Sequence, residues 1–378
     1  MQQANPDMHL KNLKLSNFKN YETAELQFSE KINCFIGANG AGKTNILDAI
    51  YYLSFCKSYF NASDQQNILH EAPYFTIHGQ YLRPGMETDL VSCVQKRSQK
   101  KLFQRNKKTY DRLADHIGKI PLVMISPYDR DLINDGSDLR RKFIDGVISQ
   151  FSPPYLDALL QYNKALGQRN ALLKQFGDQG KFDRELLALW EQQMLKPAKV
   201  IFEMRSNFLA DFQLIFQKYY EIVSGGKEQV TIVYDSGMHK QSLEVLLEQS
   251  LSRDRATRYT NVGIHKDDLL FLMSDFPVKR FGSQGQQKSF VIAVRLAQYE
   301  FTYNKMGYQP ILLFDDIFDK LDDQRVDQLV KLLGNDYFGQ IFITDTQRQR
   351  INYLFEGTNI DHKIFSVENG AVQSNQEV

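Results

Sequence analysis

The stretch that decides the fold is GANGAGKTN, residues 37–45. It follows an apolar run, INCFI, and precedes a helical pattern that continues to Leu53. Its two outer glycines, the lysine and the threonine have the spacing of a Walker A loop, whose glycines let backbone N–H groups face a phosphate. Strand, loop and helix in this order predict a P-loop nucleotide-binding fold.

The chemistry of the loop assigns a role to each polar residue. Lys43 is expected to reach the β- and γ-phosphates of ATP, and the Thr44 hydroxyl to ligate Mg²⁺. Lys43 therefore counts among the predicted catalytic residues. The residues of the loop predicted to bind nucleotide are Gly37, Asn39, Gly40, Gly42, Lys43, Thr44 and Asn45.

A second apolar run ends in two acids, ILLFDD, residues 311–316. An apolar strand that ends in an acid is the Walker B pattern, so Asp315 is predicted to hold Mg²⁺. Asp316 is predicted to act as the general base that polarises the attacking water. The alternative is that the two acids only cap the following helix.

A third stretch, FGSQGQQKSF at residues 281–290, places glycines and glutamines at the start of a helix. In ABC-type ATPases such a signature loop meets the γ-phosphate bound by the other subunit. Ser283 offers a hydroxyl, Gly285 an unobstructed backbone N–H and Gln286 a carboxamide at a helix N-terminus, which favours an anion. The three motifs together predict a composite site and an ATP-dependent homodimer.

Two shorter motifs follow Walker B. FDKLDDQR occupies the D-loop position, with Asp322 expected at the dimer seam. IFITDT ends a strand at the switch position, where Thr344 and Asp345 replace the usual ABC histidine. That replacement argues against a transporter-type ATPase.

Composition bounds the remaining possibilities. The chain has 378 residues, 42% of them hydrophobic and 24% charged, with a net charge of +1. These values are ordinary for a soluble globular protein. Without a long apolar run, a signal-peptide core or metal-ligand spacing of its three cysteines, the sequence predicts a cytoplasmic protein with no membrane partner.

The chain divides into three predicted regions. Residues 1–150 carry Walker A and a mixed β lobe, residues 151–254 form a helical arm, and residues 255–378 carry the signature, Walker B, D-loop and switch. We expect an α/β ATPase head of ABC type, with a mixed β lobe and a parallel-sheet core, assembled from both chain ends. Apolar periodicity predicts long helices in the inserted arm, with a kink at Pro197.

A basic segment, KRSQKKLFQRNKKTYDR at residues 96–112, contains eight basic residues and one acid. Against a chain of net charge +1, this concentration predicts a rim hairpin that contacts DNA phosphates. The alternative is a solvated sheet edge kept charged against aggregation. The DNA-binding candidates are Lys100, Lys101, Lys107 and Lys108.

The sequence leaves some residues without an assigned role. His265, Asp267 and Asp268 in HKDD resemble a metal site, although adjacent acids on a strand point to opposite faces and favour a structural cap. Arg140 and Arg141 are expected to pair with acids or touch a phosphate. A Q-loop glutamine remains unassigned, since neither Gln80 nor Gln95 has a persuasive context.

Nearly the whole chain resembles the RecF family of bacterial gap-repair ATPases. The resemblance rests on GANGAGKTNILDAIYYLS, ISPYDRDLINDGSDLRRKFID, YLDALLQYNKALGQRNALLK, TNVGIHKDDLLFLM, KRFGSQGQQKS and LLFDDIFDKLD. The chain departs from the family pattern at several positions: Ile264 and Lys266 flank the histidine, Asp319 and Lys320 replace Ser-Glu in the D-loop, and Phe60 stands near a frequent arginine.

The resemblance implies a dimer that binds DNA, either at junctions of single and double strands or on gapped duplex, and hydrolyses ATP slowly as a DNA-stimulated switch. It also implies work with RecR and RecO to direct RecA onto gapped DNA. Two alternatives come from other classes: a DNA nuclease with HKDD as its metal site, and an ATPase subunit of a transporter.

Overall fold

The computed structural model describes residues 8–83, 88–226, 228–318, 326, 328, 332, 337–355 and 361–375. Contacts divide the chain into two units. The head unit contains residues 1–129, 222–226 and 288–378, and the arm unit contains residues 130–221 and 227–287. Both chain ends therefore contribute to the head unit. Residues 130–150 and 255–287, assigned to the head in the sequence analysis, group with the arm unit, whereas the functional division into three regions stays a prediction.

The core sheet of the head unit has six strands in the order β15-β14-β3-β13-β12-β8, parallel except for β14 with β15. Its members are β3 (Ile32–Ile36), β8 (Leu122–Ile125), β12 (Ile311–Phe314), β13 (Ile341–Asp345), β14 (His362–Glu368) and β15 (Ala371–Asn375). Every residue of β3, β8, β12 and β13 is buried, as expected of parallel strands covered on both faces. The segments that follow these strands meet at one edge of the sheet.

The second sheet of the head unit is antiparallel, in the order β2-β1-β4-β5-β6-β7. Its strands are β1 (His9–Phe18), β2 (Tyr21–Gln27), β4 (Tyr74–Leu82), β5 (Thr88–Lys96), β6 (Leu102–Arg105) and β7 (Lys108–Thr109). Burial alternates along β4 and β5, so this sheet has one packed face.

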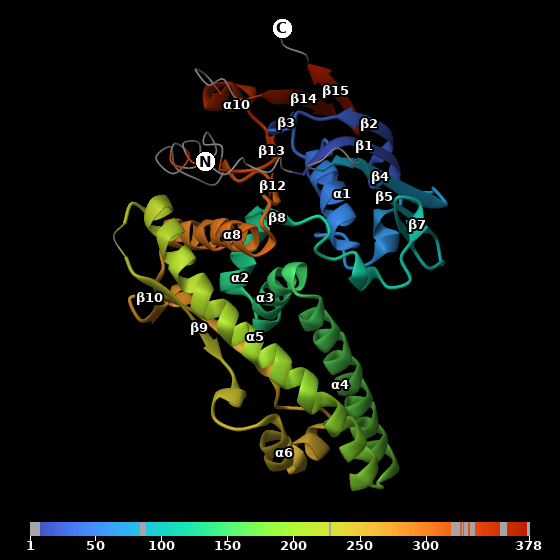
Figure 1. Ribbon diagram of the computed structural model, residues 1–378, viewed down its shortest axis with the longest axis vertical. Coiled ribbons are helices and arrows are strands. Elements are labelled where there is room, and N and C mark those ends of the chain that lie inside the picture. The colour runs from blue at the N-terminus through green and yellow to red at the C-terminus, as the bar shows by residue number, and fades with distance from the viewer. Residues whose placement is uncertain are drawn as a thin grey trace. The chain divides into compact units, whose positions relative to one another are not determined.

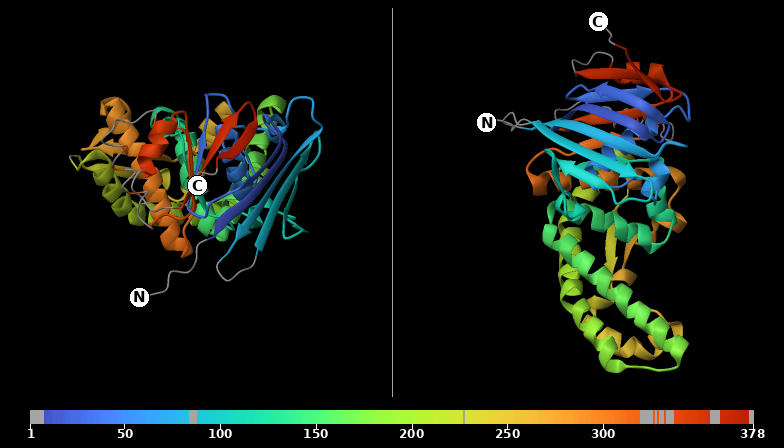
Figure 2. Two further views of the ribbon diagram at one scale, coloured as in Figure 1. Left: turned by 90° about the horizontal axis from the view of Figure 1, so that it is seen from above. Right: turned by 90° about the vertical axis from the view of Figure 1, so that its right-hand side faces the viewer.

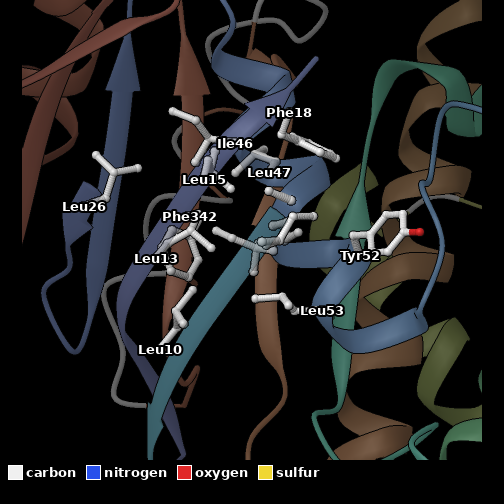
Figure 3. Close-up of a cluster of buried hydrophobic side chains, with 14 of the residues drawn as sticks. Leu10, Leu13, Leu15, Phe18, Leu26, Ile46, Leu47, Tyr52, Leu53 and Phe342 are labelled. Carbon is white, nitrogen blue, oxygen red and sulfur yellow. The ribbon is translucent and has the colours of Figure 1, made fainter. Parts of the chain in front are cut away.

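Helix α1 (Lys43–Phe55) joins the two sheets of the head unit, because it contacts β1, β4 and β5 on one side and β8 and β13 on the other. Figure 3 shows the core that results: Leu10, Leu13 and Leu15 of β1 lie beside Ile46, Leu47 and Leu53 of α1 and Phe342 of β13. Helix α10 (Arg348–Phe355) and most of α8 (Gln284–Met306), from Lys288 onward, also belong to this unit. The P-loop thus begins from the centre of the hydrophobic core.

The arm unit combines helices with a small antiparallel sheet (Figure 1). Its helices are α2 (Asp131–Asn134), α3 (Ser137–Phe151), α4 (Pro153–Gln179), α5 (Arg184–Ser224), α6 (Leu243–Thr257) and α7 (Val278–Phe281). Its sheet has the order β11-β10-β9, from β9 (Val230–Asp235), β10 (Asp268–Met273) and β11 (Phe276–Pro277). Figures 1 and 2 both show α4 and α5 alongside each other. Helix α5 continues through Pro197 as one element of 41 residues.

The fold class predicted from the motifs is confirmed: this is the P-loop head fold of ABC and Smc ATPases with a helical insertion. Three strands, β9, β11 and β15, were not predicted. The segment around HKDD differs from the expectation, because β10 pairs with β9 in the arm unit and not with the parallel sheet. Among the described residues, no helix is both long enough and apolar enough to cross a membrane.

Candidate functional site

The P-loop lies between β3 and α1, and its glycines are required by close approach of the backbone. A Cβ on Gly37 would lie 2.2 Å from the carbonyl oxygen of Val367. Gly42 has φ of 117°, and a Cβ there would lie 2.5 Å from the Asn20 side chain. A larger residue at Gly37 would displace the loop from the neighbouring strand β14, and one at Gly42 would displace it from the turn between β1 and β2.

Lys43 spans the loop from inside. Its Nζ donates to the carbonyl oxygens of Gly37 at 2.9 Å and Ala38 at 3.1 Å, and its side chain is buried. The ammonium group therefore lies beside the concave backbone of the P-loop, where a phosphate chain would bind.

The turn between β1 and β2 holds the outside of the loop. Asn20 accepts from Asn45 Nδ2 at 2.7 Å and donates to the carbonyl oxygen of Ala41 at 3.1 Å. Tyr21 Oη donates to the carbonyl oxygen of Gly42 at 3.0 Å. The sequence analysis missed both Asn20 and Tyr21, since they lie where β2 begins, two strands before the Walker A loop, and carry no motif of their own.

The structure brings the Walker A threonine and the first Walker B acid together. Thr44 Oγ1 donates to Asp315 Oδ1 at 2.8 Å, and Thr344 Oγ1 donates to the same oxygen at 3.0 Å. The backbone N–H of Asp316 donates to Thr344 Oγ1 at 2.8 Å. Thr344, which replaces the switch histidine, therefore positions both acids.

Burial raises the pKa of Asp315 from its ordinary value of 3.8 to about 6. The hydrogen bonds from Thr44 and Thr344 oppose this rise, and the neighbouring charge of Asp316 adds to it. A buried carboxylate with too little positive charge nearby is a natural cation ligand, because a bound cation would offset the cost of its ionisation.

The residues at this position fit Mg²⁺. Thr44 and Asp315 supply a hydroxyl and a carboxylate, both of them hard oxygen donors, and Mg²⁺ on a nucleotide takes its remaining ligands from phosphates and water. No cluster of three or more His, Cys, Asp or Glu side chains suited to a metal occurs among the described residues.

Asp345, the second switch residue, is buried and turned away from this pair. Its carboxylate accepts from the backbone N–H of Gln347 at 2.7 Å and from Arg350 at 3.1 Å. These contacts are with residues at the start of α10, so they indicate a structural role for Asp345. The D-loop residues Asp319, Lys320 and Asp322 lie outside the described residues.

The signature loop, described within the arm unit, forms a reciprocal cap at the start of α8. Ser283 N–H donates to Gln286 Oε1 at 2.7 Å, and Gln286 N–H donates to Ser283 Oγ at 3.2 Å. Gln286 Nε2 donates to Glu228 Oε1 at 2.7 Å. Ser283 is exposed and Gly285 is half-buried, so the loop presents its hydroxyl and backbone to the surroundings.

The HKDD residues are all engaged within the arm unit. His265 Nδ1 lies 2.8 Å from Tyr162 Oη and its Nε2 lies 3.1 Å from the carbonyl oxygen of Thr260. Burial lowers the pKa of His265 to about 4, so the ring is neutral. Asp267 accepts from Tyr234 and pairs with Arg205 at 3.2 Å. These contacts match the structural cap and not a metal site.

Arg140 and Arg141 are likewise explained by the arm unit itself. Arg140 Nε donates to Asp268 Oδ1 at 2.6 Å, and Arg141 pairs with Asp138 and donates to the carbonyl oxygen of Asp267 at 2.5 Å. Both arginines pair with acids, which is the first of the two expected roles.

Neither glutamine considered for the Q-loop faces the P-loop edge. Gln80 in β4 accepts from Asn12 at 2.7 Å, and Gln95 in β5 is buried and donates to the carbonyl oxygens of Lys96 and Gln99. Both belong to the antiparallel sheet.

The basic segment forms the end of β5, a turn, and strands β6 and β7, as the predicted hairpin required. Lys100, Lys107 and Lys108 are exposed. Lys101 requires a correction: its Nζ pairs with Asp64 at 2.7 Å and donates to the carbonyl oxygen of Cys56 at 2.6 Å. A lysine whose ammonium is held inside the fold is not available to a DNA phosphate, so Lys101 leaves the candidate set.

Three comparisons relate this geometry to known proteins. Residues 8–228 match the family model described as AAA ATPase domain. The chain is 52% identical over 372 residues to the DNA replication and repair protein RecF of Phocaeicola vulgatus, covering 98% of this chain and 100% of the relative. A solved structure of the recombination mediator protein RecF-ATP in the RecFOR pathway matches with a TM-score of 0.90 at 27% identity, covering 100% of both chains.

A more distant structure shares only the fold. The Smc head domain of Pyrococcus furiosus with an extended coiled coil matches with a TM-score of 0.56 at 16% identity, covering 97% of this chain and 96% of that chain. The Smc head therefore shares the head fold with this chain, whereas the RecF proteins also match it in sequence over nearly its whole length.

Proposed function

The chain belongs to the RecF family of DNA replication and repair proteins, and we propose on this premise that it is an ATP-gated DNA-binding switch of recombinational repair. Two copies close around two ATP molecules, bind gapped duplex DNA while closed, and reopen after slow hydrolysis. The observation that carries the proposal is the contact of Thr44 and Thr344 with Asp315 beside a complete P-loop.

Nucleotide binding is assigned to the P-loop. Its backbone N–H groups and the start of α1 bind the phosphates, and Lys43, already beside the carbonyl groups of the loop, exchanges these contacts for phosphate oxygens. Thr44 and Asp315 would hold Mg²⁺, which when bound screens the charge of the β- and γ-phosphates.

Hydrolysis is assigned to Asp316. Its backbone N–H donates to Thr344, and its backbone has a left-handed conformation with φ of 43°. Asp316 orients the attacking water and accepts its proton, while Lys43 stabilises the charge that develops on the phosphate. Slow turnover suits a switch, because the closed state must last long enough to act.

Dimerisation is assigned to the signature loop. The exposed Ser283 hydroxyl and the N–H of Gly285, at the start of a 23-residue helix, offer donors to the γ-phosphate held by a second copy. ATP is then the ligand that completes the interface, and its hydrolysis removes the phosphate that both copies share.

DNA contact is assigned to the exposed lysines of the basic segment. Lys100, Lys107 and Lys108 lie on the turn and strands at one edge of the antiparallel sheet, and Lys96 is exposed at the end of β5. Phosphate contacts of this kind give affinity without base specificity. We further propose RecR and RecO as partners in directing RecA, on family membership alone.

The nuclease alternative is disfavoured, because each HKDD side chain has a partner within the arm unit. The missing switch histidine, replaced by Thr344, disfavours the transporter alternative.

Light scattering of the purified protein with and without a slowly hydrolysed ATP analogue and Mg²⁺ tests the proposal. We expect the molar mass to double only with the analogue, and the affinity for gapped duplex to rise in the same samples. A constant molar mass together with analogue-independent DNA binding would refute the switch. Degradation of the DNA with Mg²⁺ or Mn²⁺ would instead favour the nuclease.

A further inference from the structure

A chain of polar side chains in the head unit, buried except for the half-buried Tyr59, lies outside the nucleotide site. It starts on α1, passes through the segment after α1 and the segment after β8, and ends on α8. Its members are Asp48, Ser58, Tyr59, Asp129 and Arg295.

The first half connects the P-loop helix to the segment that follows it. Asp48 lies four residues after Thr44 on α1 and is fully buried. Its carboxylate accepts from Ser58 Oγ at 2.6 Å and from the backbone N–H of Tyr59 at 2.7 Å, and it pairs with Lys19 at 2.6 Å. A shift of α1 would therefore move the backbone at Tyr59.

The second half connects that segment to α8. Tyr59 Oη donates to Asp129 Oδ1 at 2.6 Å, and Arg295 Nη2 donates to the same oxygen at 2.5 Å. The backbone N–H of Ser126 donates to Asp129 Oδ2 at 2.9 Å. Asp129 follows β8, whose Ile125 carbonyl oxygen accepts from Asp315 N–H at 2.9 Å, so this junction lies next to Walker B.

Burial makes the ion pair in this chain energetically costly. Asp129 and Arg295 are both buried, and an ion pair inside a protein must recover a large desolvation cost through good geometry. Apolar side chains of similar size would stabilise the same volume without that cost. A buried ion pair differs from apolar packing in one respect: its interaction energy changes steeply when one partner moves.

We propose that Tyr59 is a positioning residue that couples the nucleotide site to α8, and through α8 to the signature loop at its start. Phosphate binding fixes the beginning of α1, Asp48 sets the position of Tyr59, and the Tyr59 hydroxyl aligns Asp129 with Arg295. Arg295 lies 11 residues after Gln284 on the same helix. The inference rests on the proposed function, because it concerns the ATP-dependent dimer.

The test compares two hydroxyl deletions in the full-length protein. Tyr59→Phe removes the hydroxyl but keeps the ring contacts with Tyr51 and Phe60. Tyr52→Phe is the matched control, because Tyr52 Oη also donates to a carboxylate, Asp64 Oδ1, at 2.6 Å in the same unit. Both variants lose one hydroxyl–carboxylate hydrogen bond, and only the first lies on the proposed path.

Two quantities are measured for each protein. Affinity for a fluorescent ATP analogue is determined at a concentration where the protein is monomeric, and the dimer dissociation constant is determined by sedimentation with a slowly hydrolysed analogue and Mg²⁺. For Tyr59→Phe we expect nucleotide affinity within about twofold of wild type and a dimer weaker by roughly tenfold, the scale of one hydrogen bond to a charged group. Tyr52→Phe should dimerise like wild type.

Three results would overturn the inference: wild-type dimerisation by Tyr59→Phe, equal weakening in both variants, or a loss of nucleotide affinity in Tyr59→Phe as large as its loss of dimer. Arg295→Lys provides a second route, since it keeps the charge but loses the fixed guanidinium geometry. It should reproduce the Tyr59→Phe pattern, and wild-type dimerisation by it would also overturn the coupling. If wild type itself does not dimerise with the analogue, the proposed function is refuted. That outcome is distinct from the three results that overturn the coupling alone.

Discussion

Asp315→Asn is predicted to stabilise the nucleotide-free protein although it removes a residue of the proposed site. The substitution is nearly isosteric, and the carboxamide oxygen of the variant still accepts from Thr44 and Thr344. What it removes is a buried negative charge. The effect follows from the pKa of Asp315, which burial raises from 3.8 to about 6.

The sign and size follow from proton linkage. The folded protein holds the Asp315 proton more tightly than the unfolded chain does, so wild-type stability falls as pH rises from about 4 to about 6 and then levels off. The difference between 3.8 and about 6, at about 1.4 kcal/mol for each pH unit, amounts to about 3 kcal/mol above pH 7 and about half of that near pH 5. The neutral carboxamide of the Asp315→Asn variant carries no such penalty at any pH.

Calorimetry of the nucleotide-free proteins from pH 5 to pH 8, with a chelator present, measures this difference. We expect the midpoint of head-unit unfolding to lie roughly 6–12 °C higher in Asp315→Asn above pH 7, from the usual 2–4 °C for each kcal/mol in units of this size. The advantage should shrink toward pH 5. Mg²⁺ with ATP should raise the midpoint of wild type more than that of the variant, because only wild type keeps the proposed metal ligand.

Asp316→Asn is the control for this prediction. It removes an adjacent carboxylate of the same sign at a half-buried position, so a general gain from lower negative charge would appear in it too. Equal stabilisation by both variants, a variant less stable than wild type at pH 8, or a difference independent of pH would refute the assignment of the penalty to Asp315.

The remaining predictions separate the roles of the other motifs. Lys43→Met should weaken ATP binding in equilibrium titrations and give no dimer; retention of both would remove Lys43 from the phosphate site. Asp316→Asn should bind ATP and dimerise but hydrolyse ATP at least ~100-fold more slowly in single-turnover assays, and an unchanged rate would place the general base elsewhere. Ser283→Arg should bind ATP as a monomer without dimerising, and normal dimerisation would mean that the loop is not a signature loop. Removing four exposed lysines should weaken ATP-dependent DNA binding and flatten its log–log salt slope by up to about four units, with dimerisation kept. An unchanged slope would contradict the DNA surface, and Lys101→Ala, which breaks the partly buried pair with Asp64, is the control expected to lower stability without changing the slope. The four substituted lysines are Lys96, Lys100, Lys107 and Lys108.

The nucleotide site could be predicted because each of its motifs is a short continuous stretch and the geometry of parallel strands brings the motifs together. The P-loop residues are contiguous in sequence, and Walker B ends a buried strand. Parallel strands of one sheet end at the same edge, so the contact between Thr44 and Asp315, 271 residues apart, follows from the strand pattern. The strand pattern alone therefore determines the general position of the pair.

Residues that act through long-range contacts were not predictable in the same way. Tyr59 and Asp129 are 70 residues apart; Tyr59 belongs to no motif, and Asp129 lies in a stretch of the family resemblance that has no assigned role, so only the fold brings the hydroxyl to the carboxylate. Lys101 is the converse case, because it belongs to a predicted segment but does not have the predicted role. Counting charges in a basic segment says nothing about which side chain turns inward, and Lys101 turns toward Asp64 while Lys100 beside it remains exposed.

The arm unit shows what apolar periodicity leaves undetermined. The pattern predicts that α4 and α5 are helices with an apolar face, but a helix can shift by one turn along its neighbour and still bury such a face. Buried charges remove that freedom. Arg169 of α4 is fully buried, and it pairs with Glu191 of α5 at 2.9 Å and with Asp254 of α6 at 2.8 Å.

A shift of α4 by one turn, about 5.4 Å, would separate Arg169 from both acids, leaving Arg169 and Asp254 buried without an ion-pair partner and Glu191 paired only with Arg184. Breaking a buried pair in this way costs about 3–5 kcal/mol, more than one turn of altered apolar contact is expected to recover. The arginine therefore selects a single alignment of three helices that the apolar residues alone would permit in several. For a protein proposed to change its association with each ATP, a rigid arm has a physical use: displacement at its base is carried along the helices and is not lost to sliding between them.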